Sequence, residues 1–318
     1  MFRDKKVLIV TPERLGDTLL CTPAIHYLKA NYPSVQIDVL AFSELSAQTL
    51  KNNPDIHQVF VHPQNTIENK YDFALNIHGE NYLNAPLDAM KLKTYNLPEI
   101  DYSRPQAEFA LEFVQSLTPE KFEITERHYR LFPDNQDREY IQKILRDNKV
   151  DFEKDILVGC QIGCHSIAQK KWAIFRKKLT HPKVWPFEYF LELAERLYKY
   201  NPHIRLVLTG SESEKVLGNR LIKKVPSTIS FIDKTNILQL RALIDEMDLF
   251  ISPDTGVMHV ACSADIPMIA LFGPTNLQRT GPYPTLKDLQ VIQAKHMDDI
   301  SVDSVFNAVI QKLSHHLQ

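Results

Sequence analysis

The chain alternates short apolar, β-branched runs with helix-length segments, and this alternation restricts its fold more than any other feature. The first run, Lys5 to Thr11 (KKVLIVT), is typical of a strand buried on both faces of a parallel sheet. Apolar residues at helical spacing follow it, and Asn31-Tyr32-Pro33 ends that helix. The same order continues with predicted strands at Val35 to Ala41, Gln58 to His62 and Tyr71 to Ile77, and a helix over about 43 to 51.

A second series of the same kind begins at residue 156. Its clearest helix is Pro186 to Tyr200, where a proline stands at the helix start and apolar residues recur at helical spacing. Helical patterns separate its predicted strands, which are Ile156 to Gln161, Arg205 to Thr209, Ile229 to Ile232, Asp248 to Ser252 and Pro267 to Phe272. The sequence therefore predicts an α/β protein with two doubly wound, Rossmann-like domains facing a central cleft, with ligands at the carboxyl ends of the strands.

The length of 318 residues agrees with two domains. Residues 105 to 150 are predicted to be mostly helical, and Asp147 to Asp155 (DNKVDFEKD) is a charged stretch without periodicity. We place the domain boundary in that stretch, which gives domains of residues 1–150 and 151–318. A last helix over about 301–315 is expected to pack back on the first domain.

Composition excludes some classes of protein. The net charge of −2 gives no reason to expect a nucleic-acid partner, which usually binds a strongly basic domain. No stretch approaches about 18 apolar residues and the N-terminus lacks a signal-peptide pattern, so we expect a cytoplasmic protein. The four cysteines fit a reducing compartment. Cys160 and Cys164 have no partner pair at zinc-site spacing, so we expect no metal site.

An apolar strand ends at Asp254-Thr255-Gly256, and a helical pattern follows. Unpaired N–H groups and the helix dipole at such a turn form an anion site, and Gly256 has no Cβ to hold a phosphate away. His259 lies about one helical turn further on and can point at the same place. The alternative is that Asp254 or Thr255 only caps the helix and that His259 is an interior histidine.

A second turn favours the ligand interpretation. Gly273, Pro274 and Thr275 follow the predicted strand that ends at Phe272. The carboxyl ends of parallel strands lie at one edge of a sheet, so this turn and the preceding one would form a crevice.

The segment Arg14-Leu15-Gly16-Asp17 forms the turn between the first predicted strand and helix. A carboxylate there would project into the cleft and could act as a general base toward a hydroxyl group. An N-cap role for Asp17 is the alternative. The turn lacks the three-glycine dinucleotide fingerprint, which disfavours a nicotinamide-dependent oxidoreductase.

Positive charge is concentrated between Ile156 and Phe187. This stretch has Lys or Arg at positions 170, 171, 176, 177, 178 and 183 and no Asp or Glu. Lys183 precedes a helix start, where it could neutralise a diphosphate leaving group. A solvated basic loop is the alternative interpretation for Lys170 to Lys178.

Gly210 and Glu214 follow the strand Arg205 to Thr209. Carboxylates at such a strand end can accept hydrogen bonds from ribose hydroxyls or an adenine amine. Capping of the next helix is an equally good interpretation of the spacing.

Taken together, these motifs resemble those of the lipopolysaccharide heptosyltransferase family, glycosyltransferase family nine, whose members have the two-domain GT-B fold. The resemblance spans residues 5 to about 285, and the block from Asp254 to Thr275 is its most specific part. The motifs that carry it are Arg14-Leu15-Gly16-Asp17, Thr22-Pro23-Ala24, Lys183-Val184-Trp185-Pro186, Gly210 with Glu214, Asp254 to His259, Leu271 to Thr275, and Gly281-Pro282.

The resemblance implies an inverting transfer of a heptose from ADP-heptose to the inner core of lipopolysaccharide or lipooligosaccharide, without a metal or other cofactor. The first domain would bind the acceptor, a lipid A–core oligosaccharide, and the second domain the nucleotide sugar. Asp17 would be the general base. Asp254 would bind the hydroxyls of the donor sugar and Glu214 the nucleoside, while the diphosphate would be bound by Lys183, Thr255, Gly256 and His259.

The chain departs from the family pattern in one place. Relatives run almost directly from a loop hydroxyl to the Lys-X-Trp-Pro turn, whereas this chain inserts Lys170 to Thr180. Ser166 is the counterpart of that hydroxyl in the resemblance. Trp172, Phe175 and the basic residues of the insertion suggest peripheral contact with the cytoplasmic face of the inner membrane.

Other functions stay open on the sequence. A family relative could use another nucleotide sugar or another acceptor with the same fold. A non-catalytic nucleotide-sugar binding protein would retain the phosphate turns, but the presence of Asp17 disfavours it. An epimerase-type isomerase could also use such a cleft, and it would need no acceptor.

Overall fold

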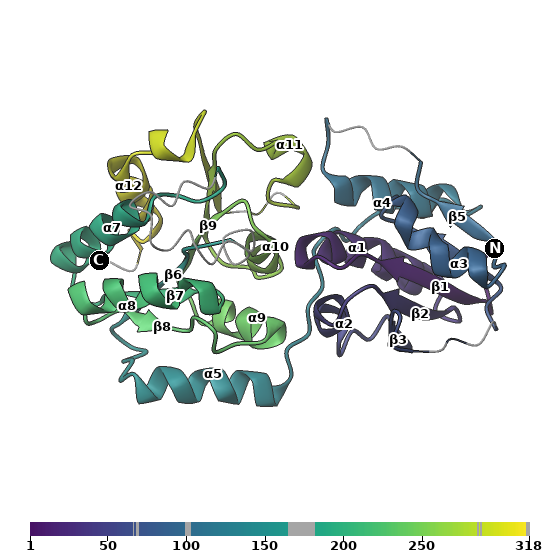
Figure 1. The fold of residues 1–318 in the computed structure, drawn as a ribbon, viewed down its shortest axis with the longest axis horizontal. Helices are drawn as coiled ribbons and strands as arrows, with labels where there is room; N and C mark the ends of the chain where they lie inside the picture. Colours follow the sequence, from purple (N-terminus) through teal and green to yellow (C-terminus); the bar gives the residue numbers. More distant parts are fainter. Residues whose placement is uncertain are drawn as a thin grey trace. The chain divides into compact units, whose positions relative to one another are not determined.

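Every strand pair in the structure is parallel, as the buried apolar runs predict. The computed structural model describes residues 1–65, 67, 70–98, 103–164, 182–284, 286 and 288–315. It divides into a first unit, Met1–Phe132 with Gln278–Pro284, and a second unit, Pro133–Leu277 with Thr285–Gln318. Figure 1 shows one sheet in each unit, with helices packed around it.

The first unit contains a five-stranded sheet in the order β3-β2-β1-β4-β5. Its strands are β1 (Lys6–Thr11), β2 (Gln36–Ala41), β3 (Gln58–Val61), β4 (Phe73–Asn76) and β5 (Thr94–Asn96). Its helices are α1 (Leu15–Asn31), α2 (Glu44–Leu50), η1 (Asn81–Asn84), α3 (Ala85–Ala89) and α4 (Gln106–Ser116). The four strands and two helices predicted in residues 5 to 77 are confirmed, and β5 was not predicted.

The second unit contains a six-stranded sheet in the order β11-β10-β9-β6-β7-β8. Its strands are β6 (Ile156–Gln161), β7 (Ile204–Thr209), β8 (Ile229–Ser230), β9 (Leu249–Pro253), β10 (Met268–Phe272) and β11 (Leu289–Gln293). Its helical segments are α5 (Asn135–Asp147), α7 (Phe187–Tyr200), η3 (Glu212–Glu214), α8 (Lys215–Lys224), α9 (Ile237–Asp245), α10 (Gly256–Cys262), η4 (Met297–Asp299) and α12 (Val302–Lys312). The short helix α11 (Leu277–Thr280) begins at the end of this unit. The five strands predicted from residue 156 onward are confirmed, and the fold class is the predicted one.

The chain changes units at Phe132/Pro133 rather than near residue 150. Helix α5 belongs to the second unit because it packs on α9, where Arg138 Nη1 lies 2.9 Å from Asp245 Oδ2 and Gln142 Nε2 lies 3.3 Å from Glu246 Oε1. The charged stretch after α5 is a turn within the second unit. Its Asp155 pairs with Arg205 of β7 at 3.2 Å.

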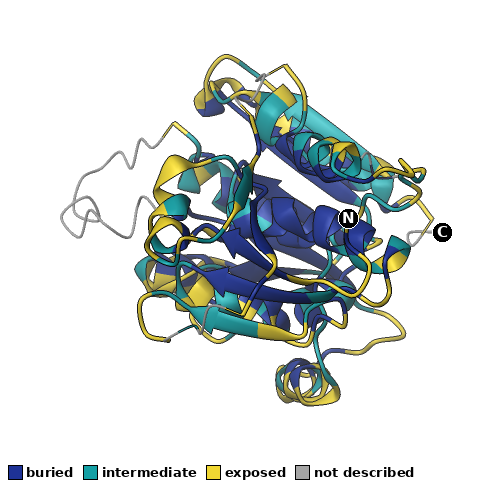
Figure 2. Ribbon diagram, turned by 90° about the vertical axis from the view of Figure 1, so that its right-hand side faces the viewer, coloured by how far each residue is buried: buried dark blue, intermediate teal, exposed yellow. Residues whose placement is uncertain are grey.

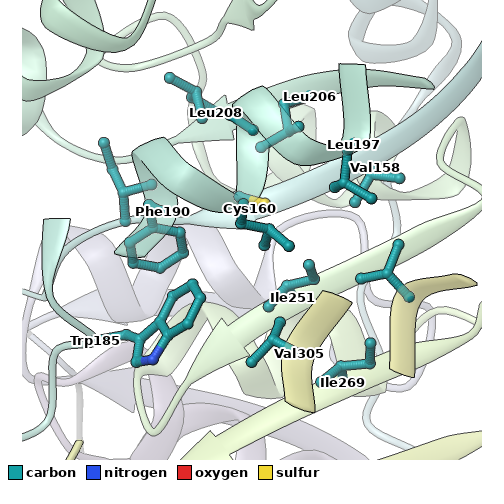
Figure 3. Close-up of a cluster of buried hydrophobic side chains, with 14 of the residues drawn as sticks. Val158, Cys160, Trp185, Phe190, Leu197, Leu206, Leu208, Ile251, Ile269 and Val305 are labelled. Atoms are coloured by element: carbon teal, nitrogen blue, oxygen red, sulfur yellow. The ribbon is translucent and has the colours of Figure 1, made fainter. Parts of the chain in front are cut away.

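Trp185 stands in the core of the second unit (Figure 3). It is fully buried, its indole Nε1 donates to the carbonyl of Ile300 at 2.9 Å, and its ring meets that of Phe190 edge-on with centroids 4.8 Å apart. Helix α12 contributes Val305 to the same cluster. Helix α12 is thus part of the core of the second unit, and the expected contact of this helix with the first domain stays a prediction.

The central strands are the most buried parts of both units, and exposed residues lie mainly on loops and outer helix faces (Figure 2). Val7, Leu8, Ile9 and Val10 of β1 have no exposed surface. Strands covered on both faces explain the continuous apolar runs in the sequence. Loops at the strand ends therefore carry the polar residues.

A substitution in the central strand of the second unit tests this packing. A Cβ added at Gly159 of β6 would lie 2.1 Å from the sulfur of Met247 and 2.4 Å from Cδ2 of Phe250. We expect Gly159→Ala to lower the free energy of unfolding by about 1–3 kcal/mol, because a well-packed core does not accept extra volume. Urea unfolding followed by circular dichroism measures this change.

Gly218→Ala in α8 is the matched control. Its added Cβ would approach only the terminal methyl of Ile232 below 3 Å, at 2.4 Å, and alanine favours a helix over glycine by about 1 kcal/mol. We expect a small change there. Equal loss in both variants would contradict the packing described for β6.

Candidate active site

The turn between β1 and α1 is held by buried hydroxyl groups. The hydroxyl of Thr18 lies 3.0 Å from the carbonyl of Arg14, 3.1 Å from that of Pro12 and 2.9 Å from Oγ of Ser46. Ser46 is in turn 3.0 Å from Oγ1 of Thr11, the last residue of β1. These contacts join the strand end, the turn and α2, so the start of α1 has a fixed position.

Asp17 lies in the first turn of α1, which begins at Leu15. Arg14 is exposed and takes the N-cap position with an extended backbone, without a side-chain cap, and Gly16 is half-buried. The Asp17 side chain is 31% exposed, and its Oδ1 lies 3.8 Å from Nε2 of His78. The positive end of the helix dipole stabilises a carboxylate at this position. Asp17 is thus ionisable, accessible and held on a buried helix.

The charge of Asp17 also acts on its neighbour Cys21. Burial, and then the negative charge of Asp17, raises the pKa of the Cys21 thiol. The thiolate is the nucleophilic form, so this cysteine is unsuited to nucleophilic catalysis.

In the second unit, Lys183 and Asp254 form an ion pair. Lys183 Nζ lies 2.8 Å from Asp254 Oδ2, and the two side chains are 39% and 5% exposed. Lys183 stands two residues before the buried Trp185, and Asp254 follows β9 directly. The pair therefore joins a residue anchored by the core to the carboxyl end of a central strand.

The turn after β9 is as expected from the sequence. Thr255 is the N-cap of α10 with an extended backbone, and Gly256 is the first residue of that helix. The Thr255 side chain does not cap the helix, and its Oγ1 is buried without a hydrogen-bond partner in the part of the chain that the structure describes. His259 is buried on the same helix. A buried hydroxyl that lacks a partner is a candidate ligand contact.

Glu214 already has a structural role. It is 1% exposed, and with Ser211 it forms a capping box in which Glu214 Oε2 accepts from the backbone N–H of Ser211 at 2.7 Å. The hydroxyl of Ser213 donates to its other oxygen at 2.6 Å. Glu214 also fills the space beside Gly163 and Gly210, where an added Cβ would lie 2.5 Å and 3.2 Å from Glu214 atoms. The capping interpretation is what the structure shows for this carboxylate.

The turn after β10 borders an open hollow of about 570 Å³. Gly273 packs so closely on Met297 and the carbonyl of Pro182 that an added Cβ would lie 2.9 Å and 3.1 Å from them. Thr275 Oγ1 is buried without a hydrogen-bond partner among the described residues. The hollow is lined by Gly273, Pro274, Thr275, Gln293, Ala294, Lys295 and His296.

The predicted residues of the second unit gather at one edge of its sheet. Parallel pairing in register aligns the ends of β10, β9, β6 and β7, as the pairs Leu271–Pro253, Cys160–Ile251 and Gln161–Thr209 show. Gly273, Asp254 and Gly210 follow these strands directly or within one residue. Asp17 belongs to the corresponding edge of the first unit, and Ser166 and Lys170 to Thr180 lie outside the described residues.

Some residues at these edges were not predicted. His78 follows β4 and contacts Asp17, and Gln293 to His296 follow β11. The predicted strand Tyr71 to Ile77 was followed by a histidine, so the strand-end argument used for Asp17 would have found it. Lys295 and His296 gave no such signal because β11 was not predicted.

No cluster of three or more His, Cys, Asp or Glu suited to a metal ion occurs within the described ranges. No helix among those described is long and apolar enough to cross a membrane.

Comparison with known proteins identifies relatives over most of the chain. The model of glycosyltransferase family 9 (heptosyltransferase) matches residues 113–309. Lipopolysaccharide core heptosyltransferase OpsX of Haemophilus influenzae is 30% identical over 149 residues, which span 45% of this chain and 37% of that protein. Lipopolysaccharide heptosyltransferase 3 of Escherichia coli is 23% identical over 305 residues, which span 82% of this chain and 81% of that protein.

Solved structures share the fold. A glycosyl transferase family 9 structure from Veillonella parvula superposes with a TM-score of 0.82 at 19% identity, covering 99% of this chain and 98% of that one. The structure of E. coli heptosyltransferase WaaC with ADP gives a TM-score of 0.69 at 16% identity, covering 96% and 99%. Two parallel-sheet α/β units and these likenesses establish the GT-B fold.

A double-mutant cycle tests the ion pair in the second unit. Lys183→Met should lower the free energy of unfolding by about 1–2 kcal/mol, because it removes the cation that pairs with the buried charge of Asp254. This loss is smaller than for a fully buried pair, because solvent screens the partly exposed Lys183. Asp254→Asn should add little in the Lys183→Met background. Urea unfolding measures each variant, and strictly additive losses would contradict the pairing. Lys154→Met, in an exposed pair with Asp151, is the control that should change little.

Proposed function

The chain belongs to glycosyltransferase family 9, the heptosyltransferases, and we propose that it transfers a heptose from ADP-heptose to the inner core of lipopolysaccharide or lipooligosaccharide with inversion at the anomeric carbon. It is a glycosyltransferase enzyme. The observation that carries the finer proposal is the accessible carboxylate of Asp17 on the first unit, together with the polar groups at one edge of the second. The two relatives from H. influenzae and E. coli compared above by sequence are lipopolysaccharide heptosyltransferases by name, and the WaaC structure contains ADP.

We assign the general base to Asp17. The Asp17 carboxylate takes the proton of an acceptor hydroxyl while that oxygen attacks the anomeric carbon of the donor. The bond from the anomeric carbon to the diphosphate oxygen breaks, and its electron pair leaves with ADP. The 31% exposure of the Asp17 side chain supports this role, because a base must reach the acceptor.

We assign the diphosphate to the edge of the second unit. Lys183 is half-exposed, so it can turn from Asp254 toward a phosphate. The hydroxyl of Thr255, the backbone N–H of Gly256 and the side chain of His259 can donate to phosphate oxygens. A lysine and fixed N–H dipoles can balance the charge of leaving ADP, so the proposed reaction proceeds without a metal.

The sugar and the nucleoside have separate proposed contacts. Asp254, released from Lys183, would accept hydrogen bonds from the heptose hydroxyls. Glu214 would accept a hydrogen bond from a ribose hydroxyl. That hydroxyl would replace the hydroxyl of Ser213 or Ser211, which now donates to the Glu214 carboxylate. The donor therefore binds by exchanging existing hydrogen bonds, which keeps these buried carboxylates satisfied.

We further propose a lipid A–core oligosaccharide as acceptor, bound by the first unit, in a protein that works in the cytoplasm. Peripheral contact with the inner membrane stays a prediction, since it depends on the basic insertion at Lys170 to Lys178, which lies outside the described residues.

Replacing the proposed base tests the mechanism. Asp17→Asn keeps the size of the side chain and removes its basicity, so kcat should fall by at least about 100-fold while the Kd for ADP is unchanged. Mass spectrometry of a truncated lipopolysaccharide acceptor incubated with ADP-heptose measures transfer. Asp88→Asn, at an exposed position of α3, is the control and should keep full activity. Unchanged turnover in Asp17→Asn would refute the base assignment.

A nucleotide panel tests the donor. A ligand that binds only the folded protein raises its melting temperature, and ligand at 100 times its Kd adds about 2.7 kcal/mol. We expect ADP and ADP-heptose to stabilise the protein more than UDP, GDP or CDP do. Preference for another nucleotide would assign a different donor to the same fold. Release of free ADP with an altered sugar in the absence of acceptor would indicate an isomerase instead.

A further inference from the structure

His78 is a buried group beside the proposed base that the mechanism above does not use. Its side chain is 5% exposed, and its Nε2 lies 3.8 Å from Asp17 Oδ1 and 3.0 Å from the amide nitrogen of Gln106. Its Nδ1 is buried and has no hydrogen-bond partner in the described part of the chain. A buried imidazole of this kind beside an ionisable carboxylate requires an explanation.

The backbone holds this histidine in place. Strands β1 and β4 are paired in parallel, with Val10 opposite Asn76, so the loops that carry Asp17 and His78 leave the sheet side by side. Gly79 follows with a φ of +89°, a conformation that favours glycine. The fully buried Asn76 fixes the turn, because its Oδ1 accepts from the N–H of Gly79 at 2.9 Å and its Nδ2 donates to the carbonyl of Glu80 at 3.0 Å.

We propose that His78 is a positioning residue for Asp17: its Nε2–H binds one carboxylate oxygen and so holds the carboxylate in one orientation toward the acceptor hydroxyl. This inference rests on the proposed role of Asp17 as the base. This arrangement requires the Gln106 amide to turn over, so that its carbonyl oxygen takes the place of the nitrogen that lies 3.0 Å from Nε2 and accepts from the same N–H. Gln106 is itself 3% exposed at the start of α4, so it can fix the proton on Nε2.

The distances suit this role. A separation of 3.8 Å is an ion-pair distance, and a rotation of the Asp17 side chain that shortens it by about 1 Å forms a hydrogen bond. Contacts of catalytic groups are commonly long without substrate and shorten when it binds. A carboxylate fixed at one oxygen has fewer orientations to lose when the acceptor arrives, so the gain appears in kcat.

Two amide substitutions separate positioning from packing. The amide nitrogen of glutamine can occupy the place of Nε2, whereas asparagine reaches only the place of Nδ1. Both side chains are polar and fit the cavity of a histidine. We expect His78→Gln to keep kcat within about threefold of the wild type and His78→Asn to lose about 10- to 100-fold. The KM for ADP-heptose and the Kd for ADP should not change, because donor contacts belong to the second unit.

A cycle with the base completes the test. If His78 acts through Asp17, His78→Asn should cost little further activity in the Asp17→Asn background. A merely structural role would lower the residual activity by the same factor in both backgrounds and would overturn the inference. So would equal kcat values for His78→Gln and His78→Asn. The activity of the Asp17→Asn variant distinguishes the two proposals. If this variant retains transfer, the base assignment fails. If it loses transfer while His78→Asn keeps the wild-type kcat, only the role of His78 is refuted.

Discussion

Parallel strand pairing in register is the constraint on which the rest of this structure depends. Parallel neighbours need a crossover for each connection, and helices supply most of the crossovers, so most strand ends meet the start of the following helix at the same edge of a sheet. In the first unit this edge carries Asp17 and His78, and in the second it carries Asp254, Gly210 and Gly273. Residues distant in sequence become neighbours without any specific attraction between them.

Burial then determines which polar groups the edge can hold. A buried polar group without a partner costs about 1–3 kcal/mol, and an unpaired buried charge costs more. Asp254 is therefore paired with Lys183, and Glu214 is closed into its capping box. The hydroxyl of Thr255 is different, because it is buried without a described partner. The paired groups stabilise the folded protein, whereas a hydroxyl such as that of Thr255 can gain a hydrogen bond from a ligand.

Most strands could be predicted from the sequence because burial on both faces leaves a continuous apolar run. Strands β5 (TYN) and β11 (LQVIQ) were not predicted, because these half-exposed edge strands contain polar residues that interrupt such a run. Strand β3 is also a half-exposed edge strand, but it keeps the apolar run Val59 to Val61 and was predicted. The positions of the proposed phosphate-binding turns could be predicted, because each directly follows a predicted strand. The capping contacts of Glu214 could not be predicted, because residue spacing alone does not distinguish a helix cap from a ligand contact.

The boundary between units shows a further limit of sequence patterns. Charge and missing periodicity led to a predicted domain boundary in Asp147 to Asp155, yet that stretch is a turn inside the second unit. The observed boundary at Phe132/Pro133 has no comparable charge pattern in the sequence. The return of Gln278–Pro284 to the first unit was equally hidden. There Tyr283 is 5% exposed and its ring lies 5.7 Å from that of Tyr129, and burial followed by the charge of Glu108 raises its pKa.

This return has a consequence for the turn at Gly273 to Thr275. The chain leaves that turn, enters the first unit through α11 and comes back after Pro284. The turn at Gly273 to Thr275, which lies at the sheet edge proposed to bind the donor, is therefore closely followed by a segment of the first unit in which Tyr283 is buried. Gln278–Pro284 therefore connects the unit that carries Lys183 covalently to the unit that carries Asp17.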